Sequence, residues 1–146
     1  MSAEQNTLAV GYIRVESGTQ KQREGNIYLQ RQAILGYAKI TDTRIVRFFA
    51  DHACISDITV RQGLSDALEF IASGKASALV IADLKRLTES VEDLLSFVSQ
   101  QRILEDGPAL VSVAEGLDTR TAEGRLRIGA AGMSACRVLG DSAGGM

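Results

Sequence analysis

The stretch LAVGYIRV, residues 8–15, is an apolar run long enough to form one buried strand. Three similar runs follow it: RIVRFFA at 44–50, SALVIAD at 77–83 and ALVSVAE at 109–115. All four are continuous rather than alternating, as is typical of strands that are covered on both faces. The sequence therefore predicts a sheet with helices on both sides.

Segments with helical spacing of apolar residues separate the four runs. Their apolar positions are Ile27, Ile34, Tyr37 and Ala38, then Leu64, Ala67, Leu68 and Ile71, then Val91, Leu94, Leu95, Val98 and Ile103. We expect the second helix to stop at Ser73-Gly74 and the third to end before Asp106. This alternation predicts an α/β fold, namely a single three-layer domain with a mostly parallel sheet of four or five strands.

Composition limits the function classes. The chain has 146 residues, a formal charge of -2, 45% hydrophobic and 23% charged residues, which suits one globular domain but not an overall electrostatic binder of nucleic acid. Cys54 and Cys136 lie far apart without a shared motif, which favours a reducing cytoplasm. We expect no membrane span, no cofactor and no metal site, because His52 is the only histidine and the carboxylates are scattered.

The ends of the chain differ from its centre. We expect a disordered N-terminus at 1–7, a domain at 8–127, and a truncated last helix with a glycine-rich tail at 128–146. Thr121 is a candidate N-cap for that helix, which we expect to run to about residue 138, with disorder beyond it.

Function is expected at one edge of the sheet. In parallel α/β sheets the site gathers in the loops at the carboxyl ends of the strands. The corresponding polar segments are 16–25, 51–63, 83–90 and 115–121.

From Val10 to about Leu126, these segments resemble the catalytic domain of the serine recombinases, the resolvase and invertase family. The similar motifs, in chain order, are YIRVESGTQ, the helix REGNIYLQRQAILGYA with Gln30, DHACISDITVRQGL with Asp51 and Arg61, LVIADLKRLTES, and EGLDTRTAEGRL. Each motif is weak alone, but all five occur in order and at the right places in the α/β pattern.

The resemblance implies a phosphate site. Serine recombinases cut DNA by attack of a serine hydroxyl on the scissile phosphate, which gives a reversible phosphoserine link. Guanidinium groups stabilise the charge on the phosphoryl oxygens, because arginine stays charged and binds phosphate bidentately. The family's motif assigns this anion-binding role to Arg14, Arg61 and Arg86, with Gln20 beside them.

The sequence departs from the family at the nucleophile. Counting from Arg14 and from Gln20 alike, the position of the family's serine holds Glu16. The following loop has Lys85 where the family has Asp, and Glu89 where it has its last catalytic Arg. We therefore expect no catalytic residues.

We expect Glu16 to act as a counter-ion that neutralises both Arg14 and Arg86, although the two arginines are equally open to purely structural ion pairing. Lys85 and Glu89, four residues apart, have the spacing to pair with each other. Ser17 is disfavoured as a displaced nucleophile, because its side chain should point to the opposite side of an extended strand end.

Three functions compete, in this order: an inactive serine-recombinase-like domain that acts as a protein-interaction or regulatory module, a DNA-binding accessory factor, and an active recombinase. We expect weak DNA binding at most, since no helix-turn-helix or basic arm follows the last helix. A homodimer or a different protein is the expected partner. The candidate anchors, expected to be exposed on a helix at 121–139, are Ile128, Met133, Val138 and Leu139.

Overall fold

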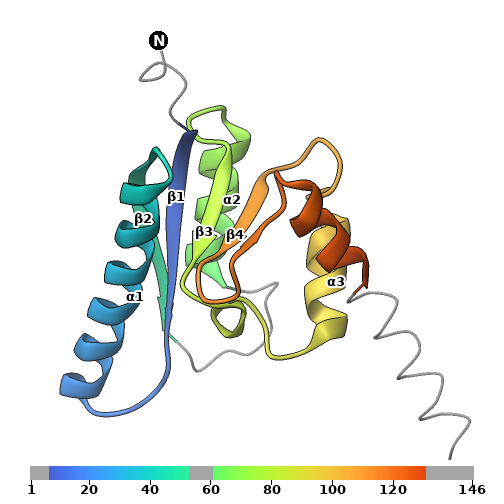
Figure 1. Ribbon diagram of the computed structural model, residues 1–146. Coiled ribbons are helices and arrows are strands. Elements are labelled where there is room, and N and C mark those ends of the chain that lie inside the picture. Colours follow the sequence, from blue (N-terminus) through green and yellow to red (C-terminus); the bar gives the residue numbers. More distant parts are fainter. Residues whose placement is uncertain (1–6, 53–60, 131–146) are drawn as a thin grey trace, which may run out of the picture.

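The computed structural model describes residues 7–52 and 61–130. Their five strands form one sheet in the order β2-β1-β3-β4-β5 (Figure 1). The strands are β1 Thr7–Val15, β2 Thr43–His52, β3 Ala78–Ile81, β4 Ala109–Ser112 and β5 Leu117–Asp118. The first four are parallel and β5 is antiparallel to β4. The predicted mostly parallel sheet is confirmed.

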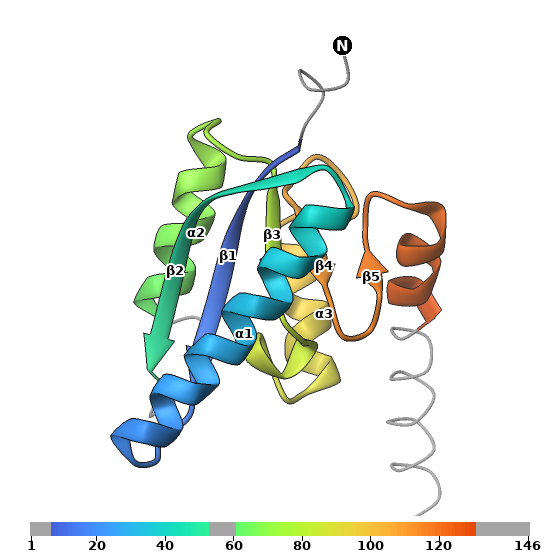
Figure 2. The same cartoon turned by 60° about the vertical axis from the view of Figure 1, so that its left-hand side comes forward.

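Helices cover both faces of this sheet. They are α1 Gln20–Ile40, α2 Gln62–Ala72 and α3 Val91–Gln100, with the short 3-10 helix η3 Leu84–Arg86 after β3. Among the described elements, α1 lies on one face while α2 and α3 lie on the other (Figures 1 and 2). Residues 122–130 form a further helical segment beside α3. The three-layer α/β architecture is therefore confirmed as well. No helix in the described ranges is long and apolar enough to cross a membrane.

The two faces of β1 belong to two separate apolar clusters. Val10 and Tyr12 pack with α2, α3 and Ile128, whereas Ala9 and Ile13 pack against α1. The strand is thus buried on both sides, which explains its continuous apolar sequence.

Local signals set most helix ends. Thr19 caps α1 through a capping box, in which its hydroxyl accepts from the Gln22 backbone N–H and the Gln22 side chain accepts from the Thr19 N–H. Gly74, with φ of 91°, follows the end of α2 as predicted.

The predicted extent of the third helix was wrong at its end. α3 stops at Gln100, and Arg102 adopts a left-handed φ of 55°. Ile103 is buried nevertheless, from a turn rather than from a helix. Ile103 fits the apolar spacing of the preceding helix because the turn places its side chain in the same core cluster as Leu94 and Val98.

The sequence allowed for a fifth strand but did not locate it, and the observed β5 corrects the predicted position of segment 115–121. Gly116, with φ of 61°, turns the chain back, so Leu117 and Asp118 run antiparallel to β4. Glu115 remains at the carboxyl edge of the sheet. Residues 118–121 are carried toward the edge where β1 begins.

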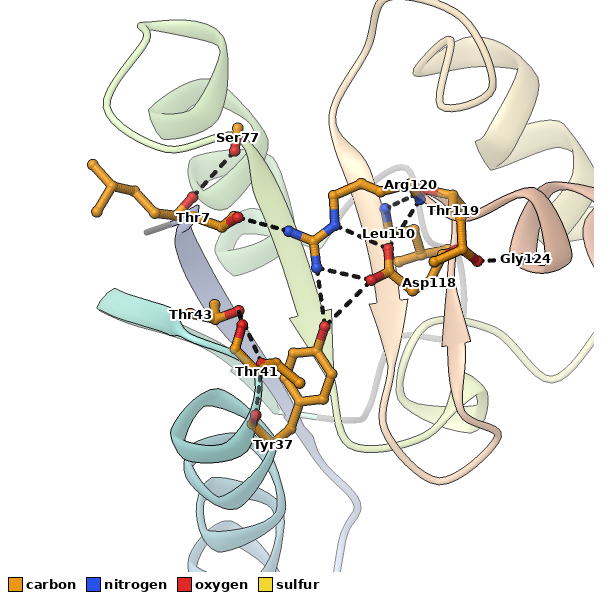
Figure 3. A network of polar contacts seen from close by, with 12 residues as sticks. Thr7, Tyr37, Thr41, Thr43, Ser77, Leu110, Asp118, Thr119, Arg120 and Gly124 are labelled. Carbon is orange, nitrogen blue, oxygen red and sulfur yellow. Dashed lines mark hydrogen bonds and ion pairs between the residues drawn. The ribbon is translucent and has the colours of Figure 1, made fainter. Parts of the chain in front are cut away.

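There, Asp118 and Arg120 form the centre of a polar network (Figure 3). The Arg120 guanidinium donates to both carboxylate oxygens of Asp118 at 2.9 and 2.8 Å, to Thr7 Oγ1 at 2.9 Å and to Tyr37 Oη at 3.0 Å. The predicted cap is also present, since Thr121 Oγ1 accepts from the Gly124 N–H at 2.9 Å. The network joins β5 to β1 and α1.

Ile128 does not have the exposure that the sequence analysis expected. It is buried in the core that α2 and α3 share, because the helical segment 122–130 packs beside α3. It is therefore unavailable as an anchor for a partner. The other proposed anchors, Met133, Val138 and Leu139, lie outside the described residues, as do residues 1–6 and the expected C-terminal disordered segment. Residue 7 was expected to be disordered, but Thr7 begins β1.

Gly63 allows α2 to sit close to β2. A Cβ at this position would lie 2.3 Å from the Ala50 carbonyl oxygen. We predict that Gly63→Ala lowers the free energy of unfolding by about 2 kcal/mol through overpacking. Gly25→Ala, whose Cβ would meet nothing within 4 Å, should instead stabilise α1 by about 0.5–1 kcal/mol. Urea denaturation measures both, and equal effects of the two substitutions would contradict the close approach.

The Asp118 network should make stability depend on acid pH. Burial raises the pKa of Asp118, but hydrogen bonds from the Arg120 side chain and backbone and the Arg120 charge outweigh it, so the net pKa is lowered. A lowered folded-state pKa contributes stability above the unfolded value of about 4, and that contribution is lost as pH falls through the folded-state pKa. We predict that Asp118→Asn costs about 1 kcal/mol at pH 7 and much less at pH 2.5.

Thermal unfolding at several pH values measures this difference. Glu123→Gln removes an exposed carboxylate from the same part of the chain and serves as the control. A cost of Asp118→Asn that stays constant between pH 7 and pH 2.5 would contradict the prediction.

Candidate anion site at the carboxyl edge

The carboxyl ends of β1, β2 and β3 bring three of the predicted site residues to one edge. Arg14 lies near the end of β1 and is paired in register with Asp51 of β2. Arg61 immediately precedes α2, and Arg86 ends η3 after β3. The fold therefore gathers the arginines that the sequence assigned to one site.

Glu16 forms an ion pair with Arg14. Its Oε2 lies 3.7 Å from Arg14 Nη1, and the side chains of Arg14 and Glu16 are 6% and 53% exposed. A half-exposed pair at this distance contributes at most about 1 kcal/mol to stability. A partly exposed carboxylate thus lies beside a buried guanidinium.

Arg86 does not share that carboxylate, which corrects the expectation that Glu16 neutralises both arginines. Arg86 Nε donates to Asp83 Oδ2 at 3.3 Å instead. Asp83 also accepts from the Lys85 backbone N–H at 3.1 Å and so caps η3. The carboxylate that pairs with Arg86 therefore comes from Asp83, in the same turn after β3.

The suggested pairing of Lys85 with Glu89 is absent. Both side chains are exposed, and neither belongs to an ion pair within the described residues. The chain between them forms η3 and an irregular turn rather than one continuous helix, so the four-residue spacing does not place them on one helical face.

Arg61 is buried and connects α2 to the turn after β3. Its Nη1 donates to the carbonyl oxygens of Arg86 at 3.2 Å and Leu87 at 2.6 Å. This guanidinium therefore has a structural role, whatever else it binds.

Asp51 caps α2 beside Arg61. Its carboxylate accepts from the backbone N–H groups of Gly63 at 2.7 Å and Leu64 at 2.9 Å, and from Tyr12 Oη at 2.8 Å. Burial and then the hydrogen bond to Asp51 raise the pKa of Tyr12 above its ordinary value. The phenol therefore stays protonated and donates to Asp51 at neutral pH.

Gln30 positions Arg14, although the sequence analysis gave it no role in the site. Its amide donates to the Arg14 carbonyl oxygen at 2.9 Å and accepts from the Arg14 N–H at 3.2 Å. The pairing of β1 with β3 ends at Tyr12, so Gln30 supplies the bonds that another strand would otherwise make. Its signal in the sequence is a polar residue between two apolar positions of the sheet-facing side of α1, the partly buried Ile27 and the buried Ile34.

Glu115 is a second residue at this edge to which the sequence assigned no role in the site. Its carboxylate accepts from the Leu84 N–H at 3.3 Å and from the Ser112 hydroxyl, and so fixes the turn that carries Arg86. Gln20, by contrast, is exposed at the start of α1 and donates to Glu24 Oε2 at 3.0 Å. Within residues 7–52 and 61–130, no hydrogen bond joins Gln20 to Arg14, Arg61 or Arg86.

The charged groups at this edge determine which kind of ligand it can bind. Among the described residues, three guanidinium groups share this edge with the carboxylates of Glu16, Asp51, Asp83 and Glu115, so acidic groups of the same chain accompany the arginines. Within the described ranges, no group of three or more His, Cys, Asp or Glu side chains is placed to hold a metal ion. The residues present fit an anion site that is largely neutralised from within.

Comparison with solved structures shows the same fold elsewhere. The chain is similar to the N-terminal catalytic domain of TP901-1 integrase, with a TM-score of 0.78 and 20% identity over 94% of this chain and 98% of that one. It is also similar to a resolvase family site-specific recombinase from Streptococcus pneumoniae, with a TM-score of 0.72 and 19% identity over 94% and 91% of the two chains.

No curated protein matches the sequence. A family model does: the resolvase N-terminal domain matches residues 9–136. This span includes every strand, all three arginines at the carboxyl edge and Glu16. The chain therefore belongs to the resolvase family and has the fold of a serine recombinase catalytic domain.

Proposed function

We propose that this resolvase-family domain does not cut DNA and acts instead as a protein-interaction or regulatory module. One observation carries the proposal. Glu16 stands where the family's motif has its nucleophilic serine, and its carboxylate lies 3.7 Å from the buried Arg14 guanidinium.

Electrostatics supports this proposal. A phosphodiester that approaches Arg14 also approaches the Glu16 carboxylate, and two like charges 4 Å apart repel by about 4 kcal/mol at an effective dielectric constant near 20. A carboxylate that attacked phosphorus would form an acyl phosphate, which hydrolyses instead of storing the bond for rejoining. Glu16 is therefore a poor replacement for serine both in binding and in chemistry.

The other arginines support the same conclusion. Arg61 donates to backbone carbonyl oxygens, and Arg86 to Asp83. Lys85 stands where the family has an aspartate, and Glu89 stands where it has its last catalytic arginine. Each of these exposed side chains therefore has the opposite charge to the family's residue. Stabilising the charge of a phosphoryl transition state requires guanidinium groups aimed at it, and here each has an internal acceptor.

A second function is favoured by the shared location of Arg14, Arg61 and Arg86. Three guanidinium groups at one edge would hold a phosphate if Glu16 moved aside, as a DNA-binding accessory or an active site-specific recombinase requires. In either case we place the protein in the cytoplasm, with a second copy or a different protein as its partner.

We predict that the protein neither nicks supercoiled plasmid nor forms a covalent DNA adduct. The assay incubates the full chain with supercoiled DNA and resolves nicked products and protein-linked ends by electrophoresis. Ser17→Ala serves as the matched variant, because Ser17 is the neighbouring exposed hydroxyl. Cleavage by the wild type that disappears in Ser17→Ala would refute the proposal.

We further predict that Glu16→Ser alone restores no strand cleavage, since Lys85 and Glu89 keep their charges. The same substitution should raise the affinity for inorganic phosphate about fivefold, because Arg14 loses a half-exposed partner worth about 1 kcal/mol. NMR titration with phosphate measures this change. Glu24→Ser, which removes a carboxylate from α1, is the control and should leave the affinity unchanged.

Two results would contradict this view. Strand exchange by Glu16→Ser would mean that the remaining site is competent. An unchanged phosphate affinity would mean that Glu16 does not occupy an anion site.

A further inference from the structure

The outer face of α1 is unusually apolar for a helix surface. Tyr28, Leu29, Leu35 and Ile40 are 61%, 68%, 36% and 82% exposed, although α1 spans only 21 residues. Leu29 and Ile40 are eleven residues apart, or about three turns, and therefore lie on one side of the helix. This set of four side chains is called the α1 patch below. No described element covers it, because α1 lies alone on its face of the sheet (Figure 2).

Gly36 lies within the same surface, and the fold of this chain does not require it. A Cβ at Gly36 would meet no atom within 4 Å, and the residue is in the interior of a helix, where glycine is less stable than alanine. Glycine does allow another backbone to approach closely. The position is therefore suited to contact with a second helix.

The charges around the α1 patch are positive. The helix carries four basic side chains and one acidic one, a net of three positive charges on a chain whose overall formal charge is -2: Lys21, Arg23, Arg31 and Lys39 against Glu24. None of these basic groups belongs to an ion pair within residues 7–52 and 61–130. Arg31 stacks over the Phe48 ring at 4.3 Å and Arg23 donates to the Gly18 carbonyl oxygen, so Lys21 and Lys39 are the basic side chains of α1 that an acidic partner can reach.

A second copy of the chain does not fit this surface. Two such faces would bring like charges together. Nucleic acid fits poorly as well, because four exposed apolar side chains contribute nothing to phosphate contacts.

We infer that the α1 patch binds an acidic amphipathic helix of a partner protein. Its apolar side chains would pack on Leu29 and Ile40, its backbone would approach at Gly36, and its carboxylates would lie beside Lys21 and Lys39. The inference goes beyond the proposed function and stands whether or not the chain cuts DNA. The site arginines belong to the carboxyl edge, whereas the patch faces away from the sheet.

The test uses a synthetic 21-residue peptide with Leu at the first and fourth positions of three heptads and Glu and Ala elsewhere. Its counterpart has the same composition with the leucines spread around the helix. Fluorescence anisotropy with the full chain should show at least tenfold tighter binding of the patterned peptide. Leu29→Glu/Ile40→Glu should weaken that binding at least tenfold, and Gly36→Gln by about threefold or more.

Val91→Glu is the matched control, because Val91 is an exposed apolar residue on α3, on the opposite face of the sheet. It should leave the affinity within twofold of the wild type. Circular dichroism establishes that each variant is folded, and Gly36→Gln should not lower the Tm because its side chain has open space. NMR shift changes on peptide addition should fall on α1.

Several outcomes would overturn the inference. One is equal binding of the two peptides, and another is an effect of Val91→Glu as large as that of the double variant. Tighter binding of a 20-nucleotide single strand or a 20-base-pair duplex than of the patterned peptide, unaffected by Leu29→Glu/Ile40→Glu, would assign the face to nucleic acid. Sedimentation as a dimer that Leu29→Glu/Ile40→Glu dissociates would assign it to a second copy.

Discussion

The carboxylate of Asp51 connects the parts of the fold that carry the candidate site. It accepts from two backbone N–H groups at the start of α2 and from the Tyr12 hydroxyl of β1. The first N–H groups of a helix have no partner within the helix, so a partly buried carboxylate at this point satisfies them and benefits from the helix dipole. With α2 held there, Arg61 is in place to bind the carbonyl oxygens of the turn that ends with Arg86.

This arrangement separates two kinds of surface. At the carboxyl edge, basic groups are matched by acidic groups from the same chain, which leaves little net attraction for an anion. On the outer face of α1, Lys21 and Lys39 belong to no ion pair within the described part of the chain, and exposed apolar side chains lie between them. A partner gains binding energy from groups whose interactions are not already made within the molecule. The outer face of α1 offers more such groups than the carboxyl edge does.

The sequence was sufficient for the parts of the fold that depend on periodicity. Continuous apolar runs predicted four strands, and helical spacing with capping and breaking residues predicted three helices. Leu117 and Asp118 were missed because a two-residue strand has no period to detect, and only Gly116 hints at the turn before it. Since that turn reverses the chain, one short strand moved half of a predicted functional segment to the other edge.

Side-chain partners were less predictable than elements. The pairing of Glu16 with Arg14 follows from their positions on one strand end, two residues apart. The partner of Arg86 did not follow, because it depends on the local geometry of η3, which brings Asp83, three residues earlier, within 3.3 Å of the Arg86 guanidinium. Gln30 and Glu115 act through contacts between elements distant in the chain, which spacing alone does not encode.

These contacts also determine how strongly each residue supports the presence of a phosphate site. Arg61 bonds to two carbonyl oxygens, and its loss would leave buried acceptors unsatisfied whether or not any phosphate is bound. Its presence is therefore weak support for a working phosphate site. Glu16 is different, because its half-exposed carboxylate makes one long ion pair and the fold does not depend on it. Because the fold does not require this carboxylate, the proposal that the domain does not cut DNA rests on Glu16 rather than on the arginines.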